Sequence, residues 1–190
     1  MAMPRGAEIL QALYGTWRFA RLDRGAMRYF DLSHAGVWRS FWAAAYAYPL
    51  FVALVLLRLD AETLERASRL YILAIQTIGY VIGWTAFPLL VIEFTRRIGR
   101  GERGFEFVVA YNWSQILQTA LLVLVALLVK FVMPKGAAGN LDLLATLAIL
   151  AYEWFIALIA IGAGGWVAVT IVFLDIAVGT SVMLIAGSLY

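Results

Sequence analysis

The chain has 190 residues, of which 64% are hydrophobic and only 14% are charged, and it contains no cysteine. Soluble domains carry about 25% charged residues, so this composition excludes a soluble globular enzyme, and it equally excludes a disordered chain. The lack of cysteine excludes disulfide frameworks, thiolate nucleophiles and cysteine-based metal centres. The class that remains is an integral membrane protein.

Residues 1–38 form a basic segment, and within it residues 1–34 lack the sustained apolar run of a signal peptide. Apolar side chains recur at helical spacing over residues 9–17, which predicts an amphipathic helix in the cytoplasmic membrane interface. Asp31 or Ser33 is expected to cap a second helix that leads into the first span. The arginines expected to contact lipid headgroups here are Arg18, Arg21, Arg24 and Arg28. The alternative interpretation of this segment is a docking surface for a cytoplasmic partner.

Five hydrophobic segments follow, each long enough to cross a bilayer, which takes about 20 residues. The expected spans are residues 40–58, 70–93, 107–130, 142–161 and 166–187. The last two flank the glycine-rich residues 162–165, a helix-terminating sequence that predicts a tight hairpin. We therefore expect an all-α polytopic membrane protein, with a cytoplasmic segment at residues 1–38 and a five-helix transmembrane domain at residues 39–190.

Positive charges are unevenly divided between the two sides of the predicted bundle. Ten arginines precede the first span or separate the second from the third, against three arginines and two lysines on the other side. This bias predicts a cytoplasmic N-terminus and an extracytoplasmic C-terminus. In the second loop, the residues expected to contact anionic headgroups are Arg96, Arg97, Arg100 and Arg103.

The basic residues also indicate the type of membrane and the partners to expect. Thirteen arginines against two lysines indicate a GC-rich genome, and hence a bacterial plasma membrane. The net charge of +3 is attributed to topology and headgroup contact, so nucleic acid is not an expected partner. The expected partners are the lipid bilayer, a second copy of the chain or another membrane protein.

Two carboxyl groups within the last two spans are the sharpest functional signal. Glu153 and Asp175 each lie eleven residues from Gly164, so an antiparallel hairpin would place both near the bilayer midplane. Small residues on the same helix faces favour close approach: Ala157, Ala160, Ala168 and Gly179. Because two carboxylates cannot both ionise cheaply at low dielectric, we expect at least one to be protonated at neutral pH.

Uncharged polar residues of the second and third spans lie at a similar depth. Asn112, Gln115 and Thr119 recur at helical spacing, and Tyr80 falls within a GxxxG pattern that permits tight packing. The candidate residues of a proton or ion pathway are Glu153, Asp175, Gln118, Asn112, Gln115 and Tyr80. The alternative is that these groups only hydrogen-bond between helices and stabilise packing.

The sequence lacks the common motifs of enzyme active sites and nucleotide-binding sites. It contains no phosphate-binding loop, zinc-protease, serine-hydrolase or dinucleotide-binding signature, and the single His34 cannot form a metal site unaided. Residues 100–104, rich in Arg and Gly, are interpreted as a short basic cytoplasmic turn. We therefore expect no enzymatic activity, no catalytic residue, no metal site and no cofactor.

The cytoplasmic segment, the five spans, and an Arg- and Gly-containing loop that leads into residues 105–113 together resemble the Yip1-like family of small membrane proteins. The resemblance covers residues 38–188 and rests on topology and this diffuse motif. It implies a five-span fold, and in the eukaryotic members a link to vesicle trafficking and small GTPases. A trafficking role does not transfer to a bacterial membrane, and no site residue is carried over from the family.

Two functions are consistent with these features. The first is a scaffold or accessory protein without enzymatic activity, which binds itself or other membrane components. The second is a proton- or cation-coupled transporter or channel for a small solute, in which Glu153 and Asp175 carry the charge. Water access to Glu153 and Asp175 distinguishes the two functions. A dry, hydrogen-bonded pair indicates helix packing, and a wet cavity indicates a pathway.

Overall fold

A computed structural model describes residues 3–134 and 138–190, and within these ranges the chain is helical and has no strand. The elements are α1 (Gly6–Ala20), η1 (Ala26–Tyr29), α2 (His34–Ser40), α3 (Trp42–Arg58), α4 (Ala61–Arg66), α5 (Arg69–Arg97), α6 (Gly101–Phe131), α7 (Ala138–Ile161) and α8 (Gly165–Gly187). Five segments, α2 with α3, α5, α6, α7 and α8, are long and apolar enough to cross a membrane. The predicted all-α class and its five spans are confirmed.

Short polar side chains set where two of these segments begin. Ser33 starts α2 by accepting a hydrogen bond from the Gly36 N–H at 3.1 Å, and Ser68 caps α5 in the same way. Asp31 is not the cap, because its Oδ1 accepts the N–H of Ser33 instead. Of the two predicted caps, the structure selects Ser33.

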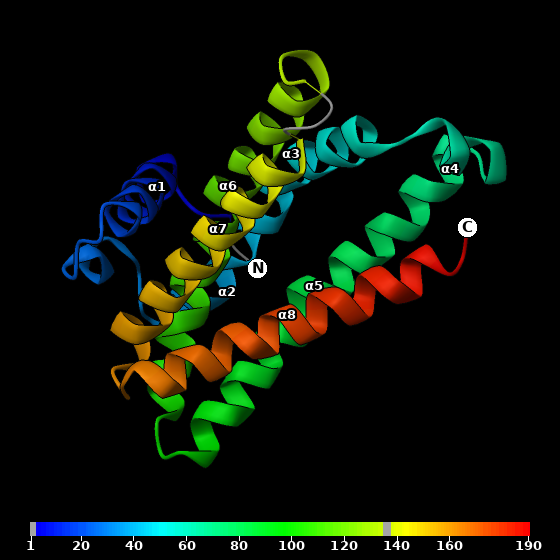
Figure 1. Cartoon of the computed structure of the whole chain (residues 1–190). Helices are drawn as coiled ribbons and strands as arrows, with labels where there is room; N and C mark the ends of the chain where they lie inside the picture. Colours follow the sequence, from blue (N-terminus) through cyan, green and yellow to red (C-terminus); the bar gives the residue numbers. More distant parts are fainter. Residues whose placement is uncertain (1–2, 135–137) are drawn as a thin grey trace.

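Helix α6 is the centre of the molecule, in contact with α1, α2, α3, α5 and α7. Its residues 107–114 are buried on every side. Figure 1 shows α3, α6 and α7 grouped together, with α8 lying along α5 as a second group. The two groups meet at the end that carries the α5–α6 turn and the α7–α8 turn, which we call the closed end. They separate toward the end that carries α4, which we call the open end (Figure 1).

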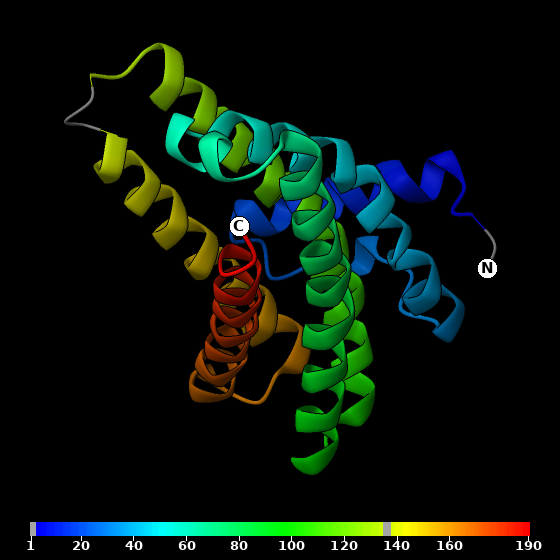
Figure 2. The ribbon, with the colours of Figure 1, turned by 90° about the vertical axis from the view of Figure 1, so that its right-hand side faces the viewer.

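The glycine-rich turn between α7 and α8 forms as predicted, with positive φ angles of 63° at Gly162 and 99° at Gly164. The two helices diverge as they leave it (Figures 1 and 2), so the tight antiparallel pairing expected along their whole length is not observed. The small residues nearest the turn, Ala157, Ala160 and Ala168, are buried, whereas Gly179 is exposed. Close packing therefore holds near the turn, and the helices separate toward the open end, past the two acids.

The interpretation of residues 100–104 as a turn is wrong, because most of them belong to helix α6. The turn is shorter and comes earlier, around Gly99 with φ of 74°, and α6 already begins at Gly101. The side chain of Arg100 donates from Nη1 to the carbonyl oxygens of Ile161 and Gly162, at 3.3 and 3.1 Å. Because these carbonyls end α7, Arg100 ties the two turns of the closed end together.

The N-terminal helix α1 packs on the bundle, against α6 and α7. Its Thr16 carbonyl accepts a hydrogen bond from the Tyr152 hydroxyl at 3.0 Å, and the fully buried Phe19 ring meets Phe155 at a centroid distance of 6.1 Å. Of the apolar residues expected on its membrane face, Tyr14 and Trp17 are exposed. The face of α1 that includes Thr16 and Phe19 therefore makes the protein contact, Tyr14 and Trp17 lie outside it, and the interfacial location stays a prediction.

Arg39 of α2 forms ion pairs with α1 and with the segment between η1 and α2. Its Nε donates to Glu8 Oε1 at 2.8 Å, and its Nη2 pairs with the Asp31 carboxylate. Partial burial of Asp31 opposes ionisation, but hydrogen bonds from Ser33 and the charge of Arg39 outweigh it and lower the pKa of Asp31. This ion pair is therefore fully formed above the ordinary aspartate pKa of about 3.9 and is lost only as the pH falls below that value.

Candidate functional site

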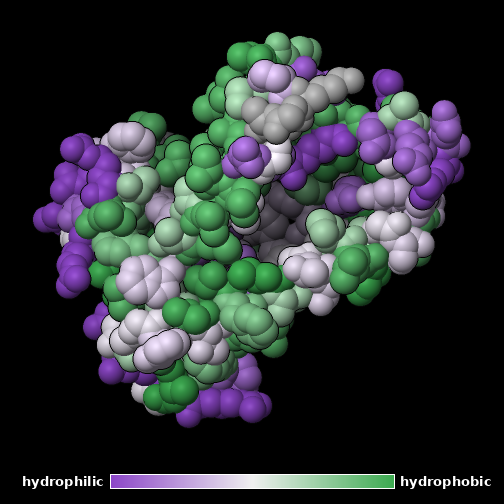
Figure 3. Space-filling view, in the orientation of Figure 1, coloured by the Kyte–Doolittle hydropathy of each residue, from purple (hydrophilic) through white to green (hydrophobic). Residues whose placement is uncertain are grey.

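A cavity of about 410 Å³ lies where the two helix groups begin to separate, and α3, α5, α6, α7 and α8 all contribute to its wall. The space-filling view shows the molecule deeply hollowed between these helices (Figure 3). The polar residues that line the cavity are Gln76, Tyr80, Tyr111, Gln115, Gln118, Thr119, Glu153 and Asp175. Five of the six predicted pathway residues thus share one cavity.

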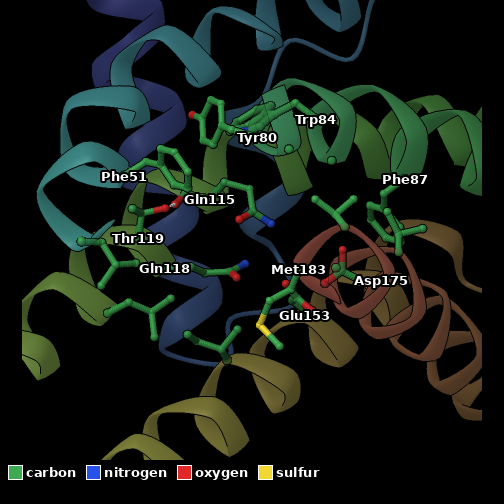
Figure 4. A pocket seen from close by; sticks show the side chains of 18 of the residues that line it. Phe51, Tyr80, Trp84, Phe87, Gln115, Gln118, Thr119, Glu153, Asp175 and Met183 are labelled. Carbon is green, nitrogen blue, oxygen red and sulfur yellow. Dashed lines mark hydrogen bonds between the residues drawn. The ribbon is translucent and has the colours of Figure 1, made fainter. Parts of the chain in front are cut away.

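Glu153 and Asp175 lie beside each other in this wall, one from α7 and the other from α8 (Figure 4). They are close enough to interact electrostatically. Asp175 is held in place, since its Oδ1 accepts a hydrogen bond from the Tyr111 hydroxyl at 2.6 Å. Glu153 is only 4% exposed, and among the described residues its Oε2 finds no hydrogen-bond partner. The pair therefore contains one anchored and one unsatisfied carboxyl group.

Helix α6 supplies the neutral polar groups. Gln115 and Gln118 extend into the cavity (Figure 4), and Gln118 is buried, with its Nε2 donating to Ser114 Oγ at 3.3 Å. Amides provide both donors and acceptors, so these side chains can solvate a polar or charged guest without adding charge.

Aromatic rings form the opposite part of the wall. The rings of Phe51 and Tyr80 lie 4.5 Å apart between centroids, and those of Tyr80 and Trp84 lie 5.8 Å apart. The Tyr80 hydroxyl donates to the Ala44 carbonyl at 2.7 Å. Tyr80 therefore contributes its ring to the cavity while its hydroxyl is bonded to α3, and its role in a pathway stays a prediction.

The residues of the cavity wall that can carry a full charge at neutral pH are both acids, Glu153 and Asp175. Of the described residues that line it, none is Lys, Arg or His. The ionisable side chains facing Glu153 are Asp175 of α8, Tyr111 of α6 and Tyr80 of α5, while α3 presents Phe51 and Leu54. No countercharge therefore neutralises the two acids from within this wall, and a bound cation or proton can do so.

Asn112 lies outside the cavity, although it was predicted beside Gln115. It is fully buried and its Nδ2 donates to Ser40 Oγ at 2.9 Å, which joins α6 to α2. The reason is helical geometry: at 100° per residue, Tyr111, Gln115 and Gln118 fall within one sector of α6, and Asn112 falls at its edge and nearer the closed end. Its position favours a packing role for this side chain.

The eight arginines expected at the membrane surface lie in two groups. In the N-terminal segment, Arg21, Arg24 and Arg28 are exposed, whereas Arg18 is half-buried and pairs with Asp23 at 2.5 Å. At the closed end, Arg96 and Arg97 pair with Glu93 and Arg103 pairs with Glu106, all with exposed guanidinium groups, while Arg100 binds the α7–α8 turn. Headgroup contact of these residues stays a prediction.

The aromatic wall was not identified from the sequence. Phe51, Trp84 and Phe87 are apolar residues within apolar spans, and composition does not distinguish them from residues that pack between helices. The depth of Trp84, too far from the span ends for an interface anchor, is the one signal that could have indicated this role.

A second cavity, of about 480 Å³, lies between α2, the adjoining Phe41, α5 and α6 and is lined almost entirely by apolar side chains. His34 is its one ionisable residue, and the His34 ring lies edge-on to Phe105 at 6.0 Å. Across residues 3–134 and 138–190, no cluster of three or more His, Cys, Asp or Glu could hold a metal ion. The polar cavity around Glu153 is therefore the stronger candidate for function.

Comparison with protein-family models, curated proteins and solved structures finds no match for this chain. The resemblance to the Yip1-like family stays a prediction.

Proposed function

We propose that this protein is a membrane transporter or channel that moves protons or small cations, with Glu153 and Asp175 as the groups that bind them. The observation that carries the proposal is the buried, unpartnered Oε2 of Glu153 in the wall of an open cavity without a positive charge. Water in this cavity would favour transport over a dry, purely structural pair.

The energetics of the acids support binding of a cation. An ionised carboxylate inside a bilayer costs several kcal/mol or more unless it is paired. Asp175 has one hydrogen bond from Tyr111, and Glu153 Oε2 has none among the described residues. A proton or a cation that enters the cavity removes this cost, and its departure restores it. Such reversible neutralisation is what a transport site requires.

For the orientation we propose that the closed end faces the cytoplasm and that the cavity opens toward the extracytoplasmic side of a plasma membrane. The proposal rests on the distribution of arginines, because those of the α5–α6 region lie at the closed end. Two basic residues on the opposite side, Arg58 and Lys130, engage Asp142 and the Leu57 carbonyl. Lys135, counted on that side, lies outside the described residues.

A scaffold role, the first function expected from the sequence, needs no cavity and no ionisable pair. It remains a proposal that flux measurements distinguish from transport. A scaffold produces no ion movement in pure lipid vesicles, while a transporter or channel does.

The test is ion flux in reconstituted liposomes that enclose a pH-sensitive dye. After a pH gradient is imposed, the parent protein is expected to dissipate it faster than empty liposomes. The double variant Glu153→Gln/Asp175→Asn should return the rate to that of empty liposomes, because both exchangeable carboxyl groups are gone. The matched control is Glu102→Gln, which removes an exposed acid in the first turn of α6. A parent rate equal to empty liposomes, or a double variant as fast as the parent, would contradict the proposal.

A further inference from the structure

We propose that the cation taken up by this cavity is a lipophilic organic monocation, an aryl- or alkylammonium ion, and not a bare metal ion. The inference rests on the proposed function, since it takes Glu153 and Asp175 as cation-binding groups, and it specifies the chemistry of the cation.

The size and ligand geometry of the cavity argue against a metal ion. Its volume of about 410 Å³ equals that of more than ten water molecules at roughly 30 Å³ each. Divalent cations need about six or more oxygen ligands at close range. Here the acidic oxygens come from one part of the wall, and among the described residues no cluster of three or more metal-ligating side chains is present. A guest with its own bulk fits this space better.

The remainder of the wall is suited to the body of an organic cation. The rings of Phe51, Tyr80 and Trp84 form a continuous aromatic series, and aromatic faces attract quaternary and protonated ammonium groups. Besides these rings and the amides of α6, the wall contains aliphatic side chains: Leu54, Leu122, Ile149, Leu150, Val178 and Val182. An apolar body gains free energy from this burial, and a hydrated inorganic ion does not.

The charge of the site corresponds to one positive charge on the guest. Two adjacent carboxyl groups in a low-dielectric wall favour a state with one shared or bound proton, which leaves a single negative charge. Asp175 accepts the Tyr111 hydrogen bond, Glu153 Oε2 has no partner among the described residues, and both acids line the cavity, so the pair offers this one negative charge to the cation. The proton and the organic cation then compete for one carboxylate, which couples their movements.

Two glycines keep the space for this guest open. A Cβ atom built on Gly83 of α5 or Gly179 of α8 would meet no atom within 4 Å, and both residues line the cavity. A large side chain at Gly83 would therefore extend into unoccupied volume without a clash at its base. The variant Gly83→Phe fills the cavity and leaves both acids in place.

The test is binding of phenyltrimethylammonium to the full chain in lipid nanodiscs, measured by equilibrium dialysis against empty nanodiscs. The controls are tert-butylbenzene, which has the same shape without charge, tetramethylammonium, which lacks the ring, and Ca²⁺. The parent should bind phenyltrimethylammonium at least about tenfold more tightly than either organic control, and Ca²⁺ should not displace it. Glu153→Gln should lower that affinity about tenfold or more, and Trp84→Leu about threefold to tenfold.

The variant Gly83→Phe distinguishes binding inside the cavity from binding at the protein surface. Gly83→Phe should abolish binding, whereas Gly187→Phe, at a glycine with equally open surroundings outside the cavity, should bind as the parent does. Equal binding of the neutral analogue, displacement by Ca²⁺, or unchanged binding by Gly83→Phe would overturn the inference. If flux in liposomes is present but phenyltrimethylammonium does not bind, the inference alone fails. If it binds but no flux occurs, transport fails and the organic-cation site stands.

Discussion

The single variant Glu153→Gln is expected to reduce proton or cation flux by about tenfold to a hundredfold, whereas Asp175→Asn should reduce it only a few-fold. A polar interaction with a charged group is worth about 1.5–3 kcal/mol, and each 1.4 kcal/mol corresponds to about tenfold in an equilibrium constant. Glu153 carries the free carboxyl oxygen, so its loss removes the exchanging group itself. Asn at position 175 can still accept the Tyr111 hydrogen bond, so the geometry of the site persists.

These rates are measured in the same dye-loaded liposomes, at equal protein per vesicle. Gln replaces Glu with little change in shape, so matched size-exclusion profiles in detergent would establish that both variants fold. Equal losses in the two variants would mean that the carboxyl groups act as one unit and that the distinction between an anchored and a free acid has no functional role. A larger loss for Asp175→Asn would reverse the assignment.

Replacing Gly104 with Ala is expected to destabilise the folded protein by about 1–3 kcal/mol, the range for overpacking a close contact. A Cβ atom at this position would lie 2.1 Å from Thr95 Oγ1 and 3.1 Å from Thr95 Cβ, where α5 and α6 cross at the closed end. Thr95 is fully buried and its hydroxyl already donates to the Val91 carbonyl at 2.8 Å. Helices α5 and α6 would have to move apart, which disturbs the junction from which the cavity opens.

A double-mutant cycle checks this contact by thermal unfolding in detergent. Gly104→Ala should lower the unfolding temperature, and adding Thr95→Ala, which removes the atom nearest to the new Cβ, should restore part of the loss. Gly139→Ala is the matched control, since its Cβ would meet nothing within 4 Å. A Gly104→Ala protein as stable as the parent, or no recovery in the double variant, would mean that the crossing is less tightly packed than the structure indicates.

The fold could be predicted well from the sequence because the membrane restricts its elements. Apolar length between charges located all five spans, and the glycines at 162 and 164 located the last turn. What sequence patterns did not reveal is how helices lie relative to one another. Gly104 was assigned to a loop, yet it lies inside α6 at a helix crossing, because a glycine that ends a helix and one that permits close contact look alike in a sequence.

The polar residues of the candidate site could be predicted from the sequence, but the helix arrangement and the aromatic residues around them could not. Ionisable and amide residues are rare in a membrane span, so Glu153, Asp175 and Gln118 stand out and indeed share one cavity. The divergence of α7 from α8, which makes that cavity, depends on packing against α6 and α5 and has no local signal. The rings of Phe51 and Trp84 likewise have no distinguishing pattern, since aromatic residues are ordinary components of an apolar span.

The most direct test of the central claim, that Glu153 and Asp175 lie in a water-accessible cavity within the membrane, is thiol labelling in nanodiscs. The chain has no cysteine, so single cysteines introduced at Gln115 and at Ile78 report without background. Gln115 lines the cavity, and Ile78, 59% exposed on α5 and outside the cavity wall, represents the apolar outer surface. A charged, water-soluble methanethiosulfonate reagent is expected to modify Gln115→Cys rapidly and Ile78→Cys slowly. Protection of both positions would contradict the account, because it would mean that the two acids are dry.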